Sequence, residues 1–171
     1  MKLSSKLIGL LGALLGTRVG FAQTSEELSL ANCITLIRQC CMPGGEIALN
    51  EDPSYESVRP YFANQACLAL LANGNPIDQA RESAWLQWYA HHQLADGSIN
   101  DWVGANGFLT DSGNRDSVDS YAATYLLACY RYQQAYGSLP PDVLPAARKA
   151  FDAMFSLKQS DGLTWALPNY H

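Results

Sequence analysis

The chain has 171 residues, which suits one domain of ordinary size. Its 11 basic and 16 acidic residues give a formal net charge of −5, and the basic residues form no cluster. An acidic chain of this kind repels phosphate backbones, so nucleic acid and anionic membranes are poor partners for it.

The first 22 residues predict a secretory signal peptide. Lys2 and Lys6 precede a short apolar run over 7–15, and the small residues Gly20 and Ala22 stand three and one positions before a cut after Ala22. The run is too short to span a bilayer, which needs about 20 apolar residues. Cleavage removes three basic residues and no acid, leaving 8 basic and 16 acidic residues and a net charge of −8. We therefore expect a secreted or periplasmic protein without membrane contact after cleavage.

Residues 23–171 are dominated by patterns with a helical period, and strand-like alternation is nearly absent. Local signals mark some ends: Pro76 and Asp78 suit a helix start, and Asn73-Gly74 suits a helix end. The periodicity predicts helices over 25–42, 56–73, 76–94, 117–136 and 141–159.

Neighbouring helices differ in polarity. The segments 76–94 and 141–159 are amphipathic, with charged residues on one face, whereas 61–72 and 121–130 contain no charge at all. A helix that is apolar all round is expected to be surrounded by protein. The order along the chain is therefore outer, inner, outer, inner, outer, and two concentric layers of helices explain this alternation better than a plain bundle does.

A glycine turn follows each predicted outer helix. The turns lie at 43–47, 93–99 and 158–165, and each leads into a short apolar or aromatic stretch. Glycine supplies the positive φ that such helix ends require, and Asp96 and Asp161 favour the turn itself. Helical hairpins that recur at intervals of several tens of residues indicate a repeat architecture.

Three of these segments resemble the six-hairpin glycosidase-like superfamily. They are Asp-Gly-Ser-Ile-Asn-Asp-Trp at 96–102, Asp-Ser-Val-Asp-Ser-Tyr-Ala-Ala-Thr-Tyr at 116–125 and Asp-Gly-Leu-Thr-Trp at 161–165. The resemblance implies an all-α fold and an (α/α)6-type toroid, here incomplete, with about two and a half hairpins over 23–171. It also implies action on carbohydrate but does not specify the reaction.

The small number of hairpins gives rise to two further expectations. We interpret the chain as a truncated or interrupted product, inactive on its own. An open arc of this kind would expose the apolar flank of helix 117–136 as a large surface patch.

Two acids are the candidate catalytic residues. Glycoside hydrolysis needs two carboxyl groups, one protonated and one ionised. Asp101 lies beside the aromatic Trp102, and Asp119 lies at the start of a charge-free helix. Burial at that helix start would raise the pKa of Asp119, while the helix dipole would lower it. Helix capping is the simpler role for Asp116 and remains open for Asp119.

Candidate substrate-binding residues come from the loops and inner-helix starts that line the cavity in such toroids. Asn64 lies in a charge-free helix and needs a partner if buried, so it either binds sugar hydroxyls or joins two helices. Trp85, Trp88 and Tyr89 are expected in the core. The predicted substrate-binding set is Tyr61, Asn64, Trp102, Arg115, Asp116, Tyr121 and Trp165.

Two alternative functions remain open. A polysaccharide lyase would use tyrosine and asparagine to remove a proton beside a uronate, but Arg59 and Arg115 are the only nearby cations to neutralise that sugar. A non-catalytic carbohydrate-binding or interaction protein is the other.

No metal or other cofactor is expected. The adjacent His91 and His92 point to different faces of a helix, and the chain has no Cys-x-x-Cys pair. Five cysteines leave at least one thiol unpaired. A bridge from Cys67 to the 33–41 group is possible, and buried apolar roles are the alternative for most of the five.

Overall fold

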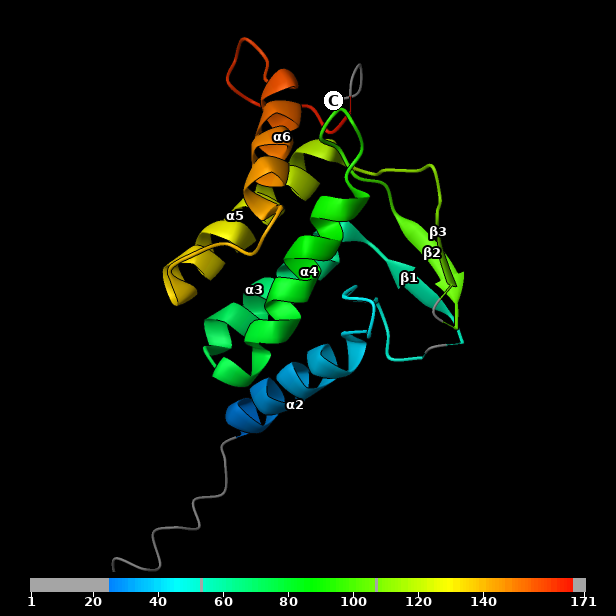
Figure 1. The fold of residues 1–171 in the computed structure, drawn as a ribbon, viewed down its shortest axis with the longest axis vertical. Helices are drawn as coiled ribbons and strands as arrows, with labels where there is room; N and C mark the ends of the chain where they lie inside the picture. The colour runs from blue at the N-terminus through cyan, green and yellow to red at the C-terminus, as the bar shows by residue number, and fades with distance from the viewer. Residues whose placement is uncertain (1–24, 53, 107, 168–171) are drawn as a thin grey trace, which may run out of the picture. The chain divides into compact units, whose positions relative to one another are not determined.

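The computed structural model describes residues 25–52, 54–106 and 108–167. The predicted signal peptide lies outside these residues. The chain divides into two units, residues 1–33 and 34–171, and the fold described below is that of the second unit. Its elements, labelled in Figure 1, are α2 (Ser25–Cys40, shared with the first unit), β1 (Glu56–Val58), α3 (Pro60–Asn73), a 3-10 turn (Pro76–Asp78), α4 (Gln79–His92), β2 (Trp102–Ala105), β3 (Phe108–Asp111), α5 (Val118–Tyr136) and α6 (Val143–Ser156).

The described residues are mostly helical, which confirms that part of the predicted fold class, and each of the five predicted helices is present. The largest boundary error is at α3, which begins at Pro60 rather than at residue 56. Proline favours the first helical position, since its missing N–H would have no partner there. It also drives the preceding residue out of the helical region, and Arg59 is extended at φ −112° and ψ 108°.

A small antiparallel sheet was not predicted. Its strand order is β1-β2-β3, with Ser57 opposite Val103 and Gly104 opposite Leu109. The segment between α4 and α5 therefore contains a β-hairpin, formed by β2 and β3, with loops on both sides of it. Asn106 adopts a positive φ of 54° at the tip, as two-residue hairpin turns require.

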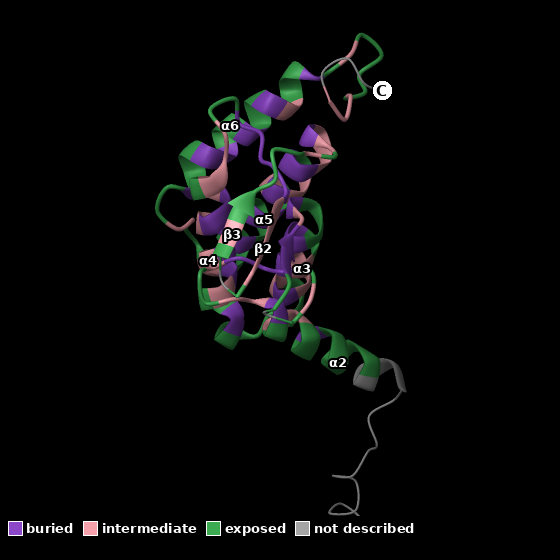
Figure 2. Ribbon diagram, turned by 90° about the vertical axis from the view of Figure 1, so that its right-hand side faces the viewer, coloured by how far each residue is buried: buried purple, intermediate pink, exposed green. Residues whose placement is uncertain are grey.

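The core lies between the helices. Helix α5 packs against both α3 and α6, and α4 contacts α3, α5 and α6. Figure 2 shows that buried residues line the helix faces that meet one another. The rings of Tyr89 on α4 and Tyr125 on α5 stack with centroids 3.7 Å apart and planes 8° apart. Trp85, Trp88 and Tyr89 are buried, as predicted.

The three glycine turns have the same backbone structure. Gly45, Gly97 and Gly162 adopt φ values of 100°, 86° and 89°. The N–H of each glycine donates to the carbonyl oxygen of the residue three positions earlier, which is Met42, Leu94 or Gln159. The N–H of that earlier residue in turn donates to the carbonyl oxygen of the residue directly after the glycine. The Asp96 carboxylate accepts from the N–H of Ser98 and the Asp161 carboxylate from that of Leu163, so the turn roles predicted for both acids are confirmed.

The charge-free helices are not enclosed on every side. On α3 the Phe62 side chain is 58% exposed, and on α5 Leu127 and Tyr130 are 44% and 55% exposed. The expectation that these helices are surrounded by protein is therefore wrong for one face of each. The companion expectation, an exposed apolar flank on helix 117–136, agrees with these values.

Among the described residues all five cysteines are free thiols. Cys40, Cys67 and Cys129 are buried, which confirms the apolar packing role for these three. Burial raises the pKa of the Cys129 thiol to about 12, so this thiol stays protonated at neutral pH. The possible bridge from Cys67 is not formed.

Candidate functional site

A buried carboxylate, Asp101, connects the segments that lead into α3 and α5. Its side chain is fully buried, and its Oδ2 lies 2.6 Å from Nη1 of Arg59, the residue before α3. Its Oδ1 accepts a hydrogen bond of 2.9 Å from the hydroxyl of Tyr121, in the first turn of α5. Asp101 thus holds both helix starts to the loop that precedes β2.

The surroundings of Asp101 shift its titration. Burial raises the pKa of this carboxyl above its usual range, while the Tyr121 hydrogen bond and the Arg59 charge oppose that rise. Burial and the neighbouring Asp101 carboxylate raise the pKa of Tyr121 in turn. The Tyr121 hydroxyl is therefore a hydrogen-bond donor and not a phenolate at neutral pH.

A groove opens above this pair of helix starts. We call it the mouth groove; its volume is about 490 Å³, within the range of small-ligand sites. It combines aromatic rings, a carboxylate, two hydroxyls and a guanidinium, the mixture that binds and orients small polar ligands. Its lining residues are Leu49, Arg59, Tyr61, Phe62, Asp116, Ser117, Ser120 and Tyr121.

Three of the predicted substrate-binding residues line the mouth groove: Tyr61, Asp116 and Tyr121. Asp116 is exposed, and its carboxylate accepts a long 3.4 Å hydrogen bond from Asn114 Nδ2. Asp101 lies behind the groove and reaches it through Tyr121 and Arg59. Asp101 is therefore not a lining residue of the groove, but it contacts two side chains that are.

Asp119, the other predicted catalytic acid, faces the third glycine turn. Its Oδ1 accepts from the Ser117 hydroxyl at 2.6 Å, and its Oδ2 accepts from the Thr164 hydroxyl at 2.7 Å. Trp165, from the same turn, packs against the small cluster formed by Val118, Ala153 and Leu157. Asp119 and Trp165 therefore lie where the third turn meets the start of α5, outside the lining of the mouth groove.

Asn64 joins helices instead of facing a ligand. It is fully buried; its amide nitrogen donates to the Tyr121 carbonyl at 3.0 Å and to Thr124 Oγ1 at 2.9 Å, and its oxygen accepts from Trp85 Nε1 at 3.0 Å. With its amide committed to three partners on α4 and α5, it has no free N–H for a sugar. Of the two roles left open for Asn64, the structure supports the inter-helix one.

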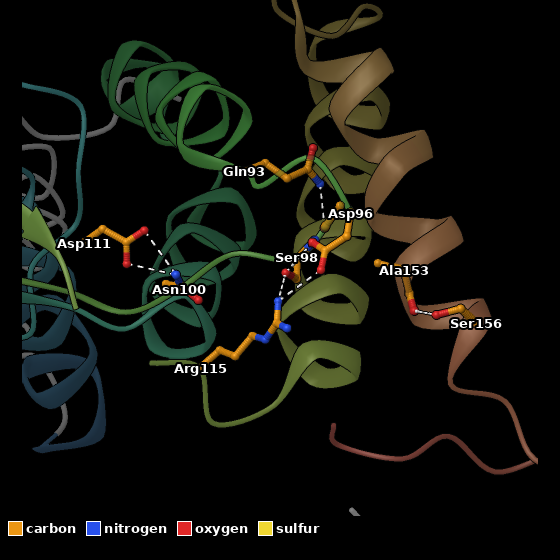
Figure 3. A network of polar contacts seen from close by, with 9 residues as sticks. Gln93, Asp96, Ser98, Asn100, Asp111, Arg115, Ala153 and Ser156 are labelled. Atoms are coloured by element: carbon orange, nitrogen blue, oxygen red, sulfur yellow. Dashed lines mark hydrogen bonds and ion pairs between the residues drawn. The ribbon is translucent and has the colours of Figure 1, made fainter. Parts of the chain in front are cut away.

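Two other predicted binding residues point elsewhere. Figure 3 shows the Arg115 side chain directed at Asp96 and Ser98; its Nη1 lies 3.2 Å from the Asp96 carboxylate and also bonds Ser98 Oγ. The Trp102 ring packs edge-on against Trp88 and His92, at centroid distances of 5.7 and 4.6 Å. Neither side chain lines the mouth groove.

Several residues of the groove were not predicted from the sequence. Leu49, Phe62, Ser117 and Ser120 line the groove, and Arg59 was considered only for a lyase. One signal in the sequence pointed to Arg59. It is a charged residue directly before Pro60 and a charge-free helix, and a cation at such a position needs an acidic partner from another segment.

A second hollow of about 570 Å³ lies between α3 and α5, but its chemistry is poorer. It is lined by Leu68, Leu71, Ala72, Leu127, Arg131, Gln134 and Ala135. It holds one charged group and is otherwise mostly aliphatic. We therefore place the candidate site at the mouth groove.

Within the described ranges no three histidine, cysteine or acidic side chains come together as a metal-binding group. None of the helices described there combines the length and apolar character needed to cross a bilayer.

The fold and site define a mostly helical protein with a ligand-sized groove at the starts of two adjacent helices. Comparison with family models, with curated proteins and with solved structures finds no match to this chain.

Proposed function

We propose that the protein binds carbohydrate in the mouth groove, as part of a glycoside hydrolase-like site in a toroid-type arrangement of α-helical hairpins. The observation that carries the proposal is the lining itself: the exposed Phe62 and Tyr61 rings lie in one groove with the Asp116 carboxylate and the Ser117 and Ser120 hydroxyls. Sugars present apolar ring faces and polar edges, and this lining offers a partner to each.

The toroid proposal rests on the repeated units. Helices α3 and α5 pack together, and the segment leading into each contains the same glycine turn after a preceding helix. In such an arrangement the inner-helix starts face one cavity, and the mouth groove lies at two of these starts.

The proposed chemistry divides the acids by position. Asp116 is the carboxylate that contacts the ligand, and Asp101 orients Tyr121 and Arg59 behind it. Glycoside hydrolysis requires two carboxyl groups beside the scissile bond, and within the described residues the groove lining contains one. We therefore expect this chain to bind oligosaccharides without appreciable turnover.

Lyase chemistry is the weaker alternative for this site. It requires a base that reaches a sugar C–H, and the Tyr121 hydroxyl is already engaged with a buried carboxylate.

The test measures binding and turnover on one panel of neutral and acidic oligosaccharides. Calorimetry or ligand-observed NMR reports binding, new reducing ends report cleavage, and ultraviolet absorption of unsaturated products reports lyase action. Y61A should weaken binding at least several-fold, since it removes a groove ring. Y130A removes an exposed ring outside the groove and should leave binding unchanged.

Three outcomes would count against the proposal. Equal losses of oligosaccharide affinity in Y61A and Y130A would show that the groove is not the binding site. Binding to no oligosaccharide would end the carbohydrate proposal. Measurable turnover by the unmodified chain would contradict the expectation that it binds without cleavage, and turnover that survives D101N, D116N and D119N would show in addition that the reaction uses other groups.

A further inference from the structure

The charges around the mouth groove are nearly all paired with one another. Arg59 is the groove's cation, and its guanidinium lies 2.6 Å from the buried Asp101 carboxylate. Among the described residues, no second cation lies within ion-pair distance of the Asp101 carboxylate. The two charges therefore cancel, although the remaining N–H groups of Arg59 still donate hydrogen bonds.

The second nearby arginine is also engaged. Arg115 Nη1 lies 3.2 Å from Asp96 Oδ2 and bonds the Ser98 hydroxyl (Figure 3). Although burial alone would raise the pKa of Asp96, hydrogen bonds from Ser98 and Arg115 hold it below the usual range. Asp96 is consequently ionised at neutral pH, and Arg115 is held at the second glycine turn by an acid that retains its charge.

One acid in the groove has no such partner. Asp116 is exposed, lines the groove and lies within ion-pair distance of none of the cations that the structure describes. Its charge also acts on Asp101, where it raises the pKa, so the two carboxylates are close enough to interact. The ligand therefore meets a net charge of about −1 in the groove.

We propose that the mouth groove takes uncharged sugar units and discriminates against uronic acids. This inference rests on the proposed carbohydrate function and adds the substrate class. A hydroxyl can donate to Asp116 and accept from Arg59 or Ser120. A uronate carboxylate in the same place meets the like charge of Asp116 and finds both arginines paired with acids.

Matched ligands isolate the effect of charge. Cello-, manno- and malto-oligosaccharides are compared with the same oligosaccharides after oxidation of their C6 alcohols to carboxylates. Linkage and ring shape are unchanged within each pair. At neutral pH and low salt, the oxidised member of the best-binding pair should bind roughly tenfold more weakly.

The substitution D116N tests the source of the discrimination. It removes the unpaired charge at an exposed position, and the ratio between neutral and oxidised ligands should fall towards one. D111N is the matched control, because Asp111 is also an exposed acid but does not line the groove. It should leave the ratio at its original value.

The outcomes separate this inference from the function on which it rests. Oxidised ligands that bind as well as neutral ones, or better, would overturn the substrate class while leaving carbohydrate binding intact. A ratio that D116N and D111N change equally would also overturn it. Binding to no member of any pair would overturn the carbohydrate function and this inference together.

Discussion

The hydroxyl of Tyr121 donates a 2.9 Å hydrogen bond to the Asp101 carboxylate, whose side chain has no exposure to solvent. The bond connects the first turn of α5 to the residue before β2, and Arg59 at the start of α3 completes it from the other side. Two helix starts and a hairpin are thus tied to one acid. The shape of the mouth groove consequently depends on a side chain that does not line it.

Removing the Tyr121 hydroxyl should destabilise the protein more than removing an exposed one. Y121F leaves Oδ1 of a buried carboxylate without its donor, which costs about 1–3 kcal/mol in free energy of unfolding. Y130F changes a tyrosine that is 55% exposed and should stay within about 0.5 kcal/mol of the original chain. Urea denaturation measures both. Equal stability of the two variants would mean that Asp101 does not depend on this bond.

Asn64 and Gln65 are neighbours in sequence with opposite environments. Asn64 is fully buried, and N64A leaves the buried Trp85 Nε1 without its acceptor, at a cost of about 1–3 kcal/mol. Gln65 is exposed, so Q65A should have little effect. Thermal denaturation compares them. A loss of oligosaccharide affinity in N64A without loss of stability would restore the predicted sugar-binding role.

The helices were predictable because their signals are local. Apolar period, glycine turns and capping residues lie within a few positions of one another, and the repeated turns at Gly45, Gly97 and Gly162 were recognised from sequence. The sheet was missed although Asn106-Gly107 is a strong hairpin signal. The flanking strands are four residues each, and strand β1 precedes its partner by more than forty residues, so pattern alone could not pair them.

The site was predictable only in part, because hydrogen-bond and ion-pair partners that come from distant segments cannot be identified from local sequence patterns. Asp101 was selected as an acid beside an aromatic residue, yet its role follows from Arg59 and Tyr121, which come from two other segments. Arg115 was likewise predicted to bind substrate, whereas its guanidinium is paired with Asp96 at the second glycine turn. Composition shows which charges exist, whereas the fold decides which of them are already paired.

Gly97 and Gly162 permit a test of how the second turn packs. Both adopt positive φ, so alanine at either position costs about 1–2 kcal/mol of backbone strain. A Cβ at Gly97 would also overlap the carbonyl oxygen of Lys149 in α6, while one at Gly162 meets no atom within 4 Å. G97A should therefore be less stable than G162A by about 1 kcal/mol or more. Equal melting temperatures would argue that the turn does not rest on α6.

Glu82 on α4 should give the protein a distinctive pH dependence. Its side chain is fully buried, and its Oε2 accepts from the Tyr136 hydroxyl at 2.8 Å. Burial raises the pKa of Glu82, the Tyr136 bond lowers it, and the nearby Asp78 charge raises it, with a net rise. Between the ordinary glutamate pKa and this raised value, the folded state holds more protons than the unfolded chain. Stability contributed by Glu82 is therefore present on the acid side of that window and lost as pH rises through it.

The variant E82Q isolates this contribution, because glutamine does not titrate. As the pH is lowered from 7 towards 4.5, the original chain should gain stability relative to E82Q, whatever the other carboxylates do to both. Y136F removes the bond that favours the ionised form, so it should move the window to higher pH. Denaturant unfolding at several pH values measures the difference between each variant and the original chain. A difference for E82Q that stays constant across this range would show that Glu82 titrates as an ordinary exposed acid, and a change in the opposite direction would show that folding lowers its pKa.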